Sequence, residues 1–140
     1  MKVEYIINGD WVWVNDCEHL RPMQVAAIKR KSGQLYAECV DPEDATEHCE
    51  CLVDKLEGIR INKRVLEANR FEWDDTFRLW RKVLMEGHYI IWEEDDVQIP
   101  RLRVVTPYRR ASMDFADTCI HHLQQALRFC GLRHTSVVPR

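Results

Sequence analysis

Turn-forming sequences recur so closely in the first part of the chain that only short strands fit between them. Strand-forming runs occupy residues 2–14, 23–29 and 35–40. The turns that separate or end these runs are expected at Asn8-Gly9-Asp10, Lys31-Ser32-Gly33 and Asp41-Pro42. Four or five short strands before residue 58 predict a small, bent antiparallel sheet, and an SH3-like barrel is one form that such a sheet takes.

Residues 43–56 fit either a helix or a strand. Asp41-Pro42 could cap and begin a helix, because proline is favoured at the first helical position. Cys49, Cys51 and Val53 instead alternate with polar residues, as they would in a strand. We favour the strand for this segment.

The rest of the chain combines strands with two helical patterns. Strands are expected at 76–84, 88–94 and 97–106, joined by turns at Glu86-Gly87 and Asp95-Asp96. Helices are expected from Asn62, a favourable N-cap, to Asn69 and at about 117–130, with a loop at 107–116 and a short strand at 136–138. These elements predict a three-stranded antiparallel sheet with two helices.

The predicted fold class is therefore α+β. A chain of 140 residues, 46% of them hydrophobic, can bury a sizeable core, and we expect one domain over residues 1–140. It should comprise an N-terminal β subregion, 1–58, and a C-terminal α+β subregion, 59–140. No apolar run is long enough for a transmembrane helix and no secretory signal is recognisable, so we expect a cytoplasmic location and no membrane partner.

The second helix has a clear apolar face. Ile120, Leu123, Leu127 and Cys130 recur at helical spacing, and Gly131 follows where helices commonly end in a left-handed conformation. The opposite face is expected to expose four polar side chains, those of His121, Gln124, Gln125 and Arg128.

Two blocks of the chain resemble a family of short proteins from gut Bacteroidales and from their phages and mobile elements. Residues 58–71, GIRINKRVLEANRF, are similar to the family block IPLTPEILEKNGF, although Arg70 replaces a glycine. The helix at 120–131 is similar to the block YVHQLQNLYFALTG, and Gly9-Asp10-Trp11-Val12 matches an early G-N-W-V strand. The resemblance implies a mobile-element setting and a hydrogen-bonding role for His121 and Gln124, within the molecule or to a partner. It implies no chemical activity.

Cysteine and histidine spacings do not indicate a metal site. The six cysteines are expected to be reduced thiols, as is usual in a cytoplasm. Cys49-Glu50-Cys51 is too tight for the usual zinc spacing. Cys119 and His122 lie three apart, which ligands on a helix can use, but Cys119 borders the apolar face. We therefore expect no metal, no cofactor and no structural disulfide.

Basic side chains concentrate in the second part of the chain. Residues 1–58 hold 6 basic and 12 acidic residues, whereas residues 59–140 hold 14 and 11. If the predicted strands are neighbours, one positive surface should gather the candidate ligand-binding residues Arg78, Arg81, Arg101, Arg103, Arg109 and Trp80. The alternative is an ordinary exposed sheet face, on which acidic residues such as Asp74 and Glu93 balance the arginines.

The function expected from these patterns is binding without catalysis. No glycine-rich elbow or oxyanion-hole signature accompanies any cysteine and histidine pair. We expect an interaction protein of a phage or mobile element that binds a host protein or a small anionic ligand, and that could form a homodimer. The first alternative is a nucleic-acid-associated accessory module that uses the C-terminal arginines, and the second is a small hydrolase or metal-dependent enzyme.

Overall fold

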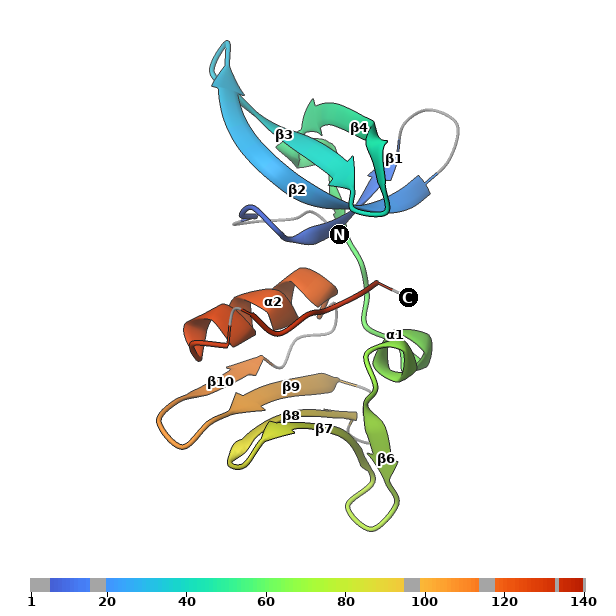
Figure 1. The fold of residues 1–140 in the computed structure, drawn as a ribbon, viewed down its shortest axis with the longest axis vertical. Coiled ribbons are helices and arrows are strands. Elements are labelled where there is room, and N and C mark those ends of the chain that lie inside the picture. Colours follow the sequence, from blue (N-terminus) through green and yellow to red (C-terminus); the bar gives the residue numbers. More distant parts are fainter. Residues whose placement is uncertain (1–5, 16–19, 95–98, 114–117, 133, 140) are drawn as a thin grey trace. The chain divides into compact units, whose positions relative to one another are not determined.

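The structure is a computed structural model, and it describes residues 6–15, 20–94, 99–113, 118–132 and 134–139. Contacts between Cα atoms divide the chain into two compact units, Met1–Ile59 and Arg60–Arg140 (Figure 1). The division falls one residue beyond the subregion boundary predicted at 58. Each unit contains one antiparallel sheet, and the chain as a whole is α+β with far more strand than helix.

The first unit is a five-stranded antiparallel sheet in the order β4-β3-β2-β1-β5. Its elements are β1 Trp11–Asn15, β2 Leu20–Lys31, β3 Gln34–Asp41, β4 Asp44–Leu52, the 3₁₀ helix η1 Val53–Lys55 and β5 Glu57–Gly58. The strand favoured for the ambiguous segment is confirmed as β4. The strand expected at 2–14 begins only at Trp11 within the described residues, and its first residues, 2–5, lie outside them.

The turns of the first unit follow the local sequence. Ser32 and Gly33 both have positive φ, 51° and 78°, as a two-residue hairpin turn between twisted strands requires. β2 then bends at a register shift between Val25 and Ala27, and its curvature is plain in Figure 1. The bent sheet encloses a core that includes Val12, Val14, Met23, Val25, Ala37, Cys39 and Leu56.

The second unit is also built on a five-stranded antiparallel sheet, in the order β10-β9-β8-β7-β6. Its elements are α1 Lys63–Ala68, β6 Glu72–Asp74, β7 Leu79–Met85, β8 His88–Glu94, β9 Pro100–Val105, β10 Arg110–Met113 and α2 Ile120–Phe129. The three predicted strands correspond to β7, β8 and β9. The prediction of a three-stranded sheet is wrong, because the edge strands β6 and β10 were not expected.

The short edge strands were missed because they have three and four residues, too few to display alternation. Asp74 Oδ1 accepts hydrogen bonds from the backbone N–H groups of Thr76 (3.0 Å) and Phe77 (3.1 Å). This Asx turn occupies residues expected to begin a strand, and β7 therefore begins at Leu79. At the other edge, β10 lies inside the expected loop 107–116 and pairs with β9.

The strand expected at 136–138 is absent from the described residues, and a side chain replaces its pairing. The Asn69 carboxamide donates to Val138 O (2.7 Å) and accepts from Val138 N (2.8 Å). A buried amide thus satisfies both backbone groups of Val138 where a neighbouring strand would otherwise do so.

Both helices end in the same hydrogen-bonding pattern. Asn62 caps α1, as predicted, by accepting a bond from Val65 N at 3.0 Å. After α2, Gly131 has a φ of 77°, and Leu132 N donates to Leu127 O at 2.7 Å. After α1, the left-handed position is held by Arg70 with a φ of 63°, and Phe71 N donates to Leu66 O at 2.9 Å.

α2 packs against β9 and β10, and it buries its apolar face as predicted. Ile120, Leu123, Leu127 and Cys130 are all buried, together with Leu102 and Val104 of β9. Within the described part of the chain, no helix has the length and apolar character needed to cross a membrane.

Candidate functional site

Strand register decides which predicted site residues share a surface. Arg81 of β7 and Arg103 of β9 both lie opposite Ile91 of β8, so all three side chains project from one face. We call this surface of the second sheet the arginine face. Arg101, two residues before Arg103, lies on it opposite Glu93.

Trp80 lies on the other face of the sheet. It is opposite Trp92, which is opposite Leu102, and the last two side chains are buried. Its ring meets that of Trp73 edge to face, with centroids 5.6 Å apart. Because neighbouring residues on a strand alternate between faces, Trp80 and Arg81 cannot both contribute to one flat surface here.

Acidic side chains offset part of the charge on the arginine face. Arg81 pairs with Asp74 at 3.2 Å. Arg103 and Arg101 both approach Glu93 Oε1, at 2.7 Å and 3.9 Å. The sequence allowed, as an alternative to a positive surface, a sheet face on which acidic residues balance the arginines. Arg81, Arg101 and Arg103 form such a mixed-charge surface.

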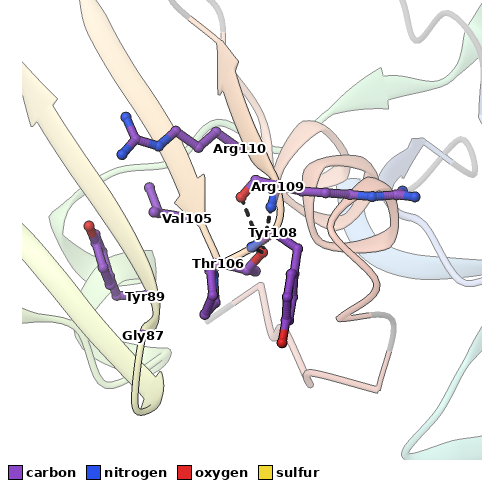
Figure 2. A pocket seen from close by; sticks show the side chains of 8 residues that line it. Gly87, Tyr89, Val105, Thr106, Tyr108, Arg109 and Arg110 are labelled. Carbon is purple, nitrogen blue, oxygen red and sulfur yellow. Dashed lines mark hydrogen bonds between the residues drawn. The ribbon is translucent and has the colours of Figure 1, made fainter.

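Two further predicted arginines do not join this group. Arg78 is exposed in the β6–β7 turn and has a φ of 53°. Arg109 lies in the β9–β10 turn, where its Nη1 donates to Phe129 O at 2.9 Å and its guanidinium lies 5.7 Å from the Phe129 ring centroid. Figure 2 shows this side chain extending away from Arg110. Arg109 therefore binds an end carbonyl of α2, where a cation is electrostatically favoured.

A pocket of about 420 Å³ lies beside the β9–β10 turn (Figure 2). Its lining residues are Gly87, Tyr89, Val105, Thr106, Pro107, Tyr108, Arg109 and Arg110. Thr106 shapes the turn, because its hydroxyl oxygen accepts from Arg109 N (2.9 Å) and Tyr108 N (3.2 Å). The Tyr108 side chain is consequently held in solvent with 89% of its surface exposed.

One row of residues connects this pocket to the arginine face. Val83, Tyr89, Val105 and Arg110 lie opposite one another across β7, β8, β9 and β10. Val83 is 67% exposed, and Arg110 is also exposed. Within the described ranges no hydrogen bond or ion pair engages the Arg110 side chain. We call Val83, Tyr89, Val105, Tyr108 and Arg110 the tyrosine–arginine row.

Arg110 and Tyr89 were absent from the predicted site. The sequence places Arg110 beside Arg109, but only the pairing of β10 with β9 separates their directions. If residues 110–113 had been predicted as a strand, the alternation of side chains would have placed Arg110 and Ser112 on one face of the sheet.

His121 is not on an exposed helix face, which corrects the sequence prediction. The residue is fully buried, and neither ring nitrogen has a hydrogen-bond partner in the part of the chain that the structure describes. Burial, assisted by the nearby positive charge of Arg128, lowers the pKa of His121 to about 4, so the imidazole is neutral at neutral pH. Gln124 is half-buried on the same helix.

The physical reason for the burial of His121 is its position in the first turn of α2. It adjoins Thr118, Cys119 and Ile120, which are all buried. The beginning of the helix is therefore buried over more of its circumference than the apolar stripe alone occupies. Helical periodicity describes one face of a helix, and it does not report how deeply an end of that helix is covered.

The cysteines within the described residues are free thiols, as predicted, and Cys17 lies outside those residues. Cys39 and Cys49 lie opposite each other on β3 and β4, and Cys51 follows on the same face of β4. A hydrogen bond from the Cys39 thiol lowers the pKa of Cys51 to about 7, and the same contact together with burial raises the pKa of Cys39.

Comparison with known proteins adds no relative. No family model matches the chain, and neither the curated proteins nor the solved structures contain a significant match. The function must therefore be argued from the surfaces described above.

Proposed function

We propose that this chain is a non-enzymatic, cytoplasmic interaction protein that binds a partner protein through the tyrosine–arginine row. The observation that carries the proposal is the row itself, in which exposed Val83 and Tyr108 accompany Arg110, whose side chain has no hydrogen-bond or ion-pair partner among the described residues. Tyrosine and arginine are enriched in protein interfaces, where they provide apolar area together with directed hydrogen bonds. The phage or mobile-element setting rests on the resemblance of the two sequence blocks, and the partner would then be a host protein.

A protein partner fits this surface better than a small anion does. A phosphate or carboxylate bound alone would need several donors, but Arg109 turns toward α2 and leaves Arg110 as the guanidinium available beside the pocket. A protein can place one acidic side chain against Arg110 and cover Tyr108 and Val83 with apolar groups. The burial of Tyr108 and Val83 against apolar groups would contribute to affinity whatever the charge of the partner.

The charge distribution of the surface also makes a nucleic acid a poorer match than a protein. Asp74 and Glu93 pair with Arg81, Arg101 and Arg103, so these three cations are already partly neutralised and would release few counterions from a phosphate backbone. The whole chain also has a formal net charge of −3.

For the first unit, we propose an SH3-like barrel as the form of its bent sheet. The long curved β2 and its register shift between Val25 and Ala27 support this proposal, because small barrels use bulged, strongly coiled strands to close.

The proposed function is tested by charge reversal with a matched control. Arg110→Glu should abolish recovery of a host protein that the tagged wild-type chain captures, and Tyr108→Ala should weaken it. Arg64→Glu makes the same charge change at an exposed position of α1 and should leave recovery unchanged. Equal recovery with Arg110→Glu and wild type, with both folded by circular dichroism, would reject the row as the binding surface.

Three further measurements test whether a second copy of the chain, a small anion or a nucleic acid binds the tyrosine–arginine row instead. Sedimentation of the wild type reports a homodimer, which would place a second copy on the row if Arg110→Glu dissociates it. Calorimetry with inorganic phosphate reports a small anion. Duplex DNA whose binding weakens steeply with salt and is lost in Arg110→Glu would support the nucleic-acid alternative.

A further inference from the structure

The beginning of α2 brings one cysteine and two histidines together. Ligand atoms of Cys119, His121 and His122 all lie within 4.8 Å of one another, and the centroids of the two imidazole rings are 4.0 Å apart. We propose that Cys119 Sγ and one ring nitrogen from each histidine bind a divalent transition-metal ion, with Zn²⁺ as the occupant.

The state of His121 is the observation that points to a ligand. Its side chain is fully buried, yet neither nitrogen finds a hydrogen-bond partner among the described residues. Buried polar groups are paired in nearly all folded proteins, because an unpaired one has lost its contacts with water and received nothing in return. A coordinated metal ion would use a lone pair of this neutral ring.

The chemistry of the three donors favours a borderline-soft transition-metal ion. A thiolate and two imidazoles suit zinc, and zinc sites with three protein ligands keep a fourth position open for water. Bonds of roughly 2.3 Å to sulfur and 2.0–2.1 Å to nitrogen place the ligand atoms of a tetrahedral site with one sulfur and two nitrogens roughly 3.3–3.6 Å apart. Small side-chain rotations would close the present spacing to that range.

The fourth position has a route to solvent. Cys119 and His121 are buried, but His122 is only half-buried, so the cluster approaches the surface on the His122 side. A water molecule could complete the tetrahedron from there.

The local electrostatics favour a thiolate at this place. Cys119 is the N-cap of α2, and the positive end of a helix stabilises a nearby thiolate. The Arg128 charge near His121 opposes a cation, and the thiolate offsets it. His122 Nδ1 accepts a hydrogen bond from Cys119 N at 2.9 Å, so coordination at that nitrogen would exchange this bond for a bond to the metal.

The sequence predicted no metal here for a definite reason. The Cys-x-His-His order differs from the paired spacings of common zinc motifs, and His121 was expected to face solvent. The folded chain brings the ligand atoms of both histidines and the cysteine within 4.8 Å of one another at the first turn of α2.

The test uses the full chain after treatment with EDTA and dialysis. Titration with Co²⁺ should give one equivalent of tightly bound ion with a thiolate-to-cobalt charge-transfer band, and Zn²⁺ should displace it. Cys119→Ser, His121→Gln and His122→Gln should each weaken Zn²⁺ binding by at least about tenfold in competition with a chromogenic chelator.

Two control substitutions resemble the test variants but lie outside the cluster. Cys130→Ser changes another buried thiol at the far end of α2, and His134→Gln changes an exposed imidazole; both should bind as the wild type does. Binding below one equivalent, a cobalt spectrum without the thiolate band, or full affinity in Cys119→Ser would each overturn the proposal. Because the cobalt spectrum is recorded on the unaltered chain, a variant that fails to fold does not prevent a decision.

Discussion

Arg70 shows how a single backbone angle affects stability. The residue follows α1 in the left-handed conformation, with a φ of 63°, at the position where Gly131 follows α2. A side chain with a Cβ is strained in this region by roughly 1 kcal/mol, whereas glycine adopts it freely.

We therefore predict that Arg70→Gly stabilises the protein. The free energy of unfolding should rise by about 0.5–1 kcal/mol, because relief of backbone strain exceeds the extra freedom of glycine in the unfolded chain. Removal of the charge also relieves Lys82, whose pKa is lowered by burial and then by Arg70. Urea denaturation measures the change.

The matched control for this substitution is Arg64→Gly. The same residue change inside α1 should destabilise the protein by about 1 kcal/mol, because glycine has a poor helix propensity. A loss of stability in both variants would contradict the role assigned to Arg70.

The Cys39 and Cys51 pair predicts a pH-dependent thiol reactivity. Because the thiolate is the reactive form and the pKa of Cys51 is lowered to about 7, alkylation of Cys51 should accelerate as the pH rises through about 7. Cys39 is buried and its pKa is raised, so it should stay unmodified while the protein is folded. Iodoacetamide labelling at a series of pH values, read by peptide mass spectrometry, reports both rates.

Cys39→Ala removes the donor to Cys51 and should move the midpoint of Cys51 labelling to higher pH, whereas Cys39→Ser retains a donor and should move it less. An unchanged midpoint in both variants would show that the hydrogen bond does not control Cys51.

At the scale of the element, α2 stabilises the second unit through its apolar stripe. Leu127 is 2% exposed and packs in the core with Leu123 and Ile120. Leu127→Ala should lower the free energy of unfolding by about 2–5 kcal/mol, since it removes buried methyl groups and leaves a cavity.

Phe129, 58% exposed on the same helix, provides the comparison. Phe129→Ala should cost less than about 1 kcal/mol, because it removes mainly solvent-exposed area. Chemical denaturation of both variants separates the effects, and similar losses at the two positions would mean that the stripe is not the main source of stability.

At the scale of the whole molecule, each unit has a core of its own. The buried apolar residues of the second unit include members of α1, β7, β8, β9 and α2, which all lie after residue 60. We predict that a fragment of residues 60–140 folds alone and unfolds cooperatively, as a unit with its own hydrophobic core should.

Leu127→Ala should destabilise that fragment by about as much as it destabilises the full chain, because α2 packs against β9 and β10 of the same unit. Thermal unfolding followed by circular dichroism tests both statements. A fragment without a cooperative transition would show that the second unit depends on residues 1–59.

Elements whose signals are local were predictable. The Ser32-Gly33 turn, the Asn62 cap and the Gly131 stop each depend on the conformational preference of one or two residues. The strands β7, β8 and β9 were recognisable because each has enough residues to display alternation. The short edge strands β6 and β10 have three and four residues, too few for a pattern, and they are defined by pairing with a neighbour.

The sequence by itself determined the α+β class and the apolar face of α2, because composition and periodicity act within a few residues of chain. Tertiary structure alone decided that Trp80 faces away from Arg81, that the Arg109 guanidinium turns to α2 while Arg110 extends the other way, and that His121 is buried beside Cys119 and His122. These outcomes depend on strand register and on what covers a helix end. Both are set by contacts between residues far apart in the chain, which no local pattern records.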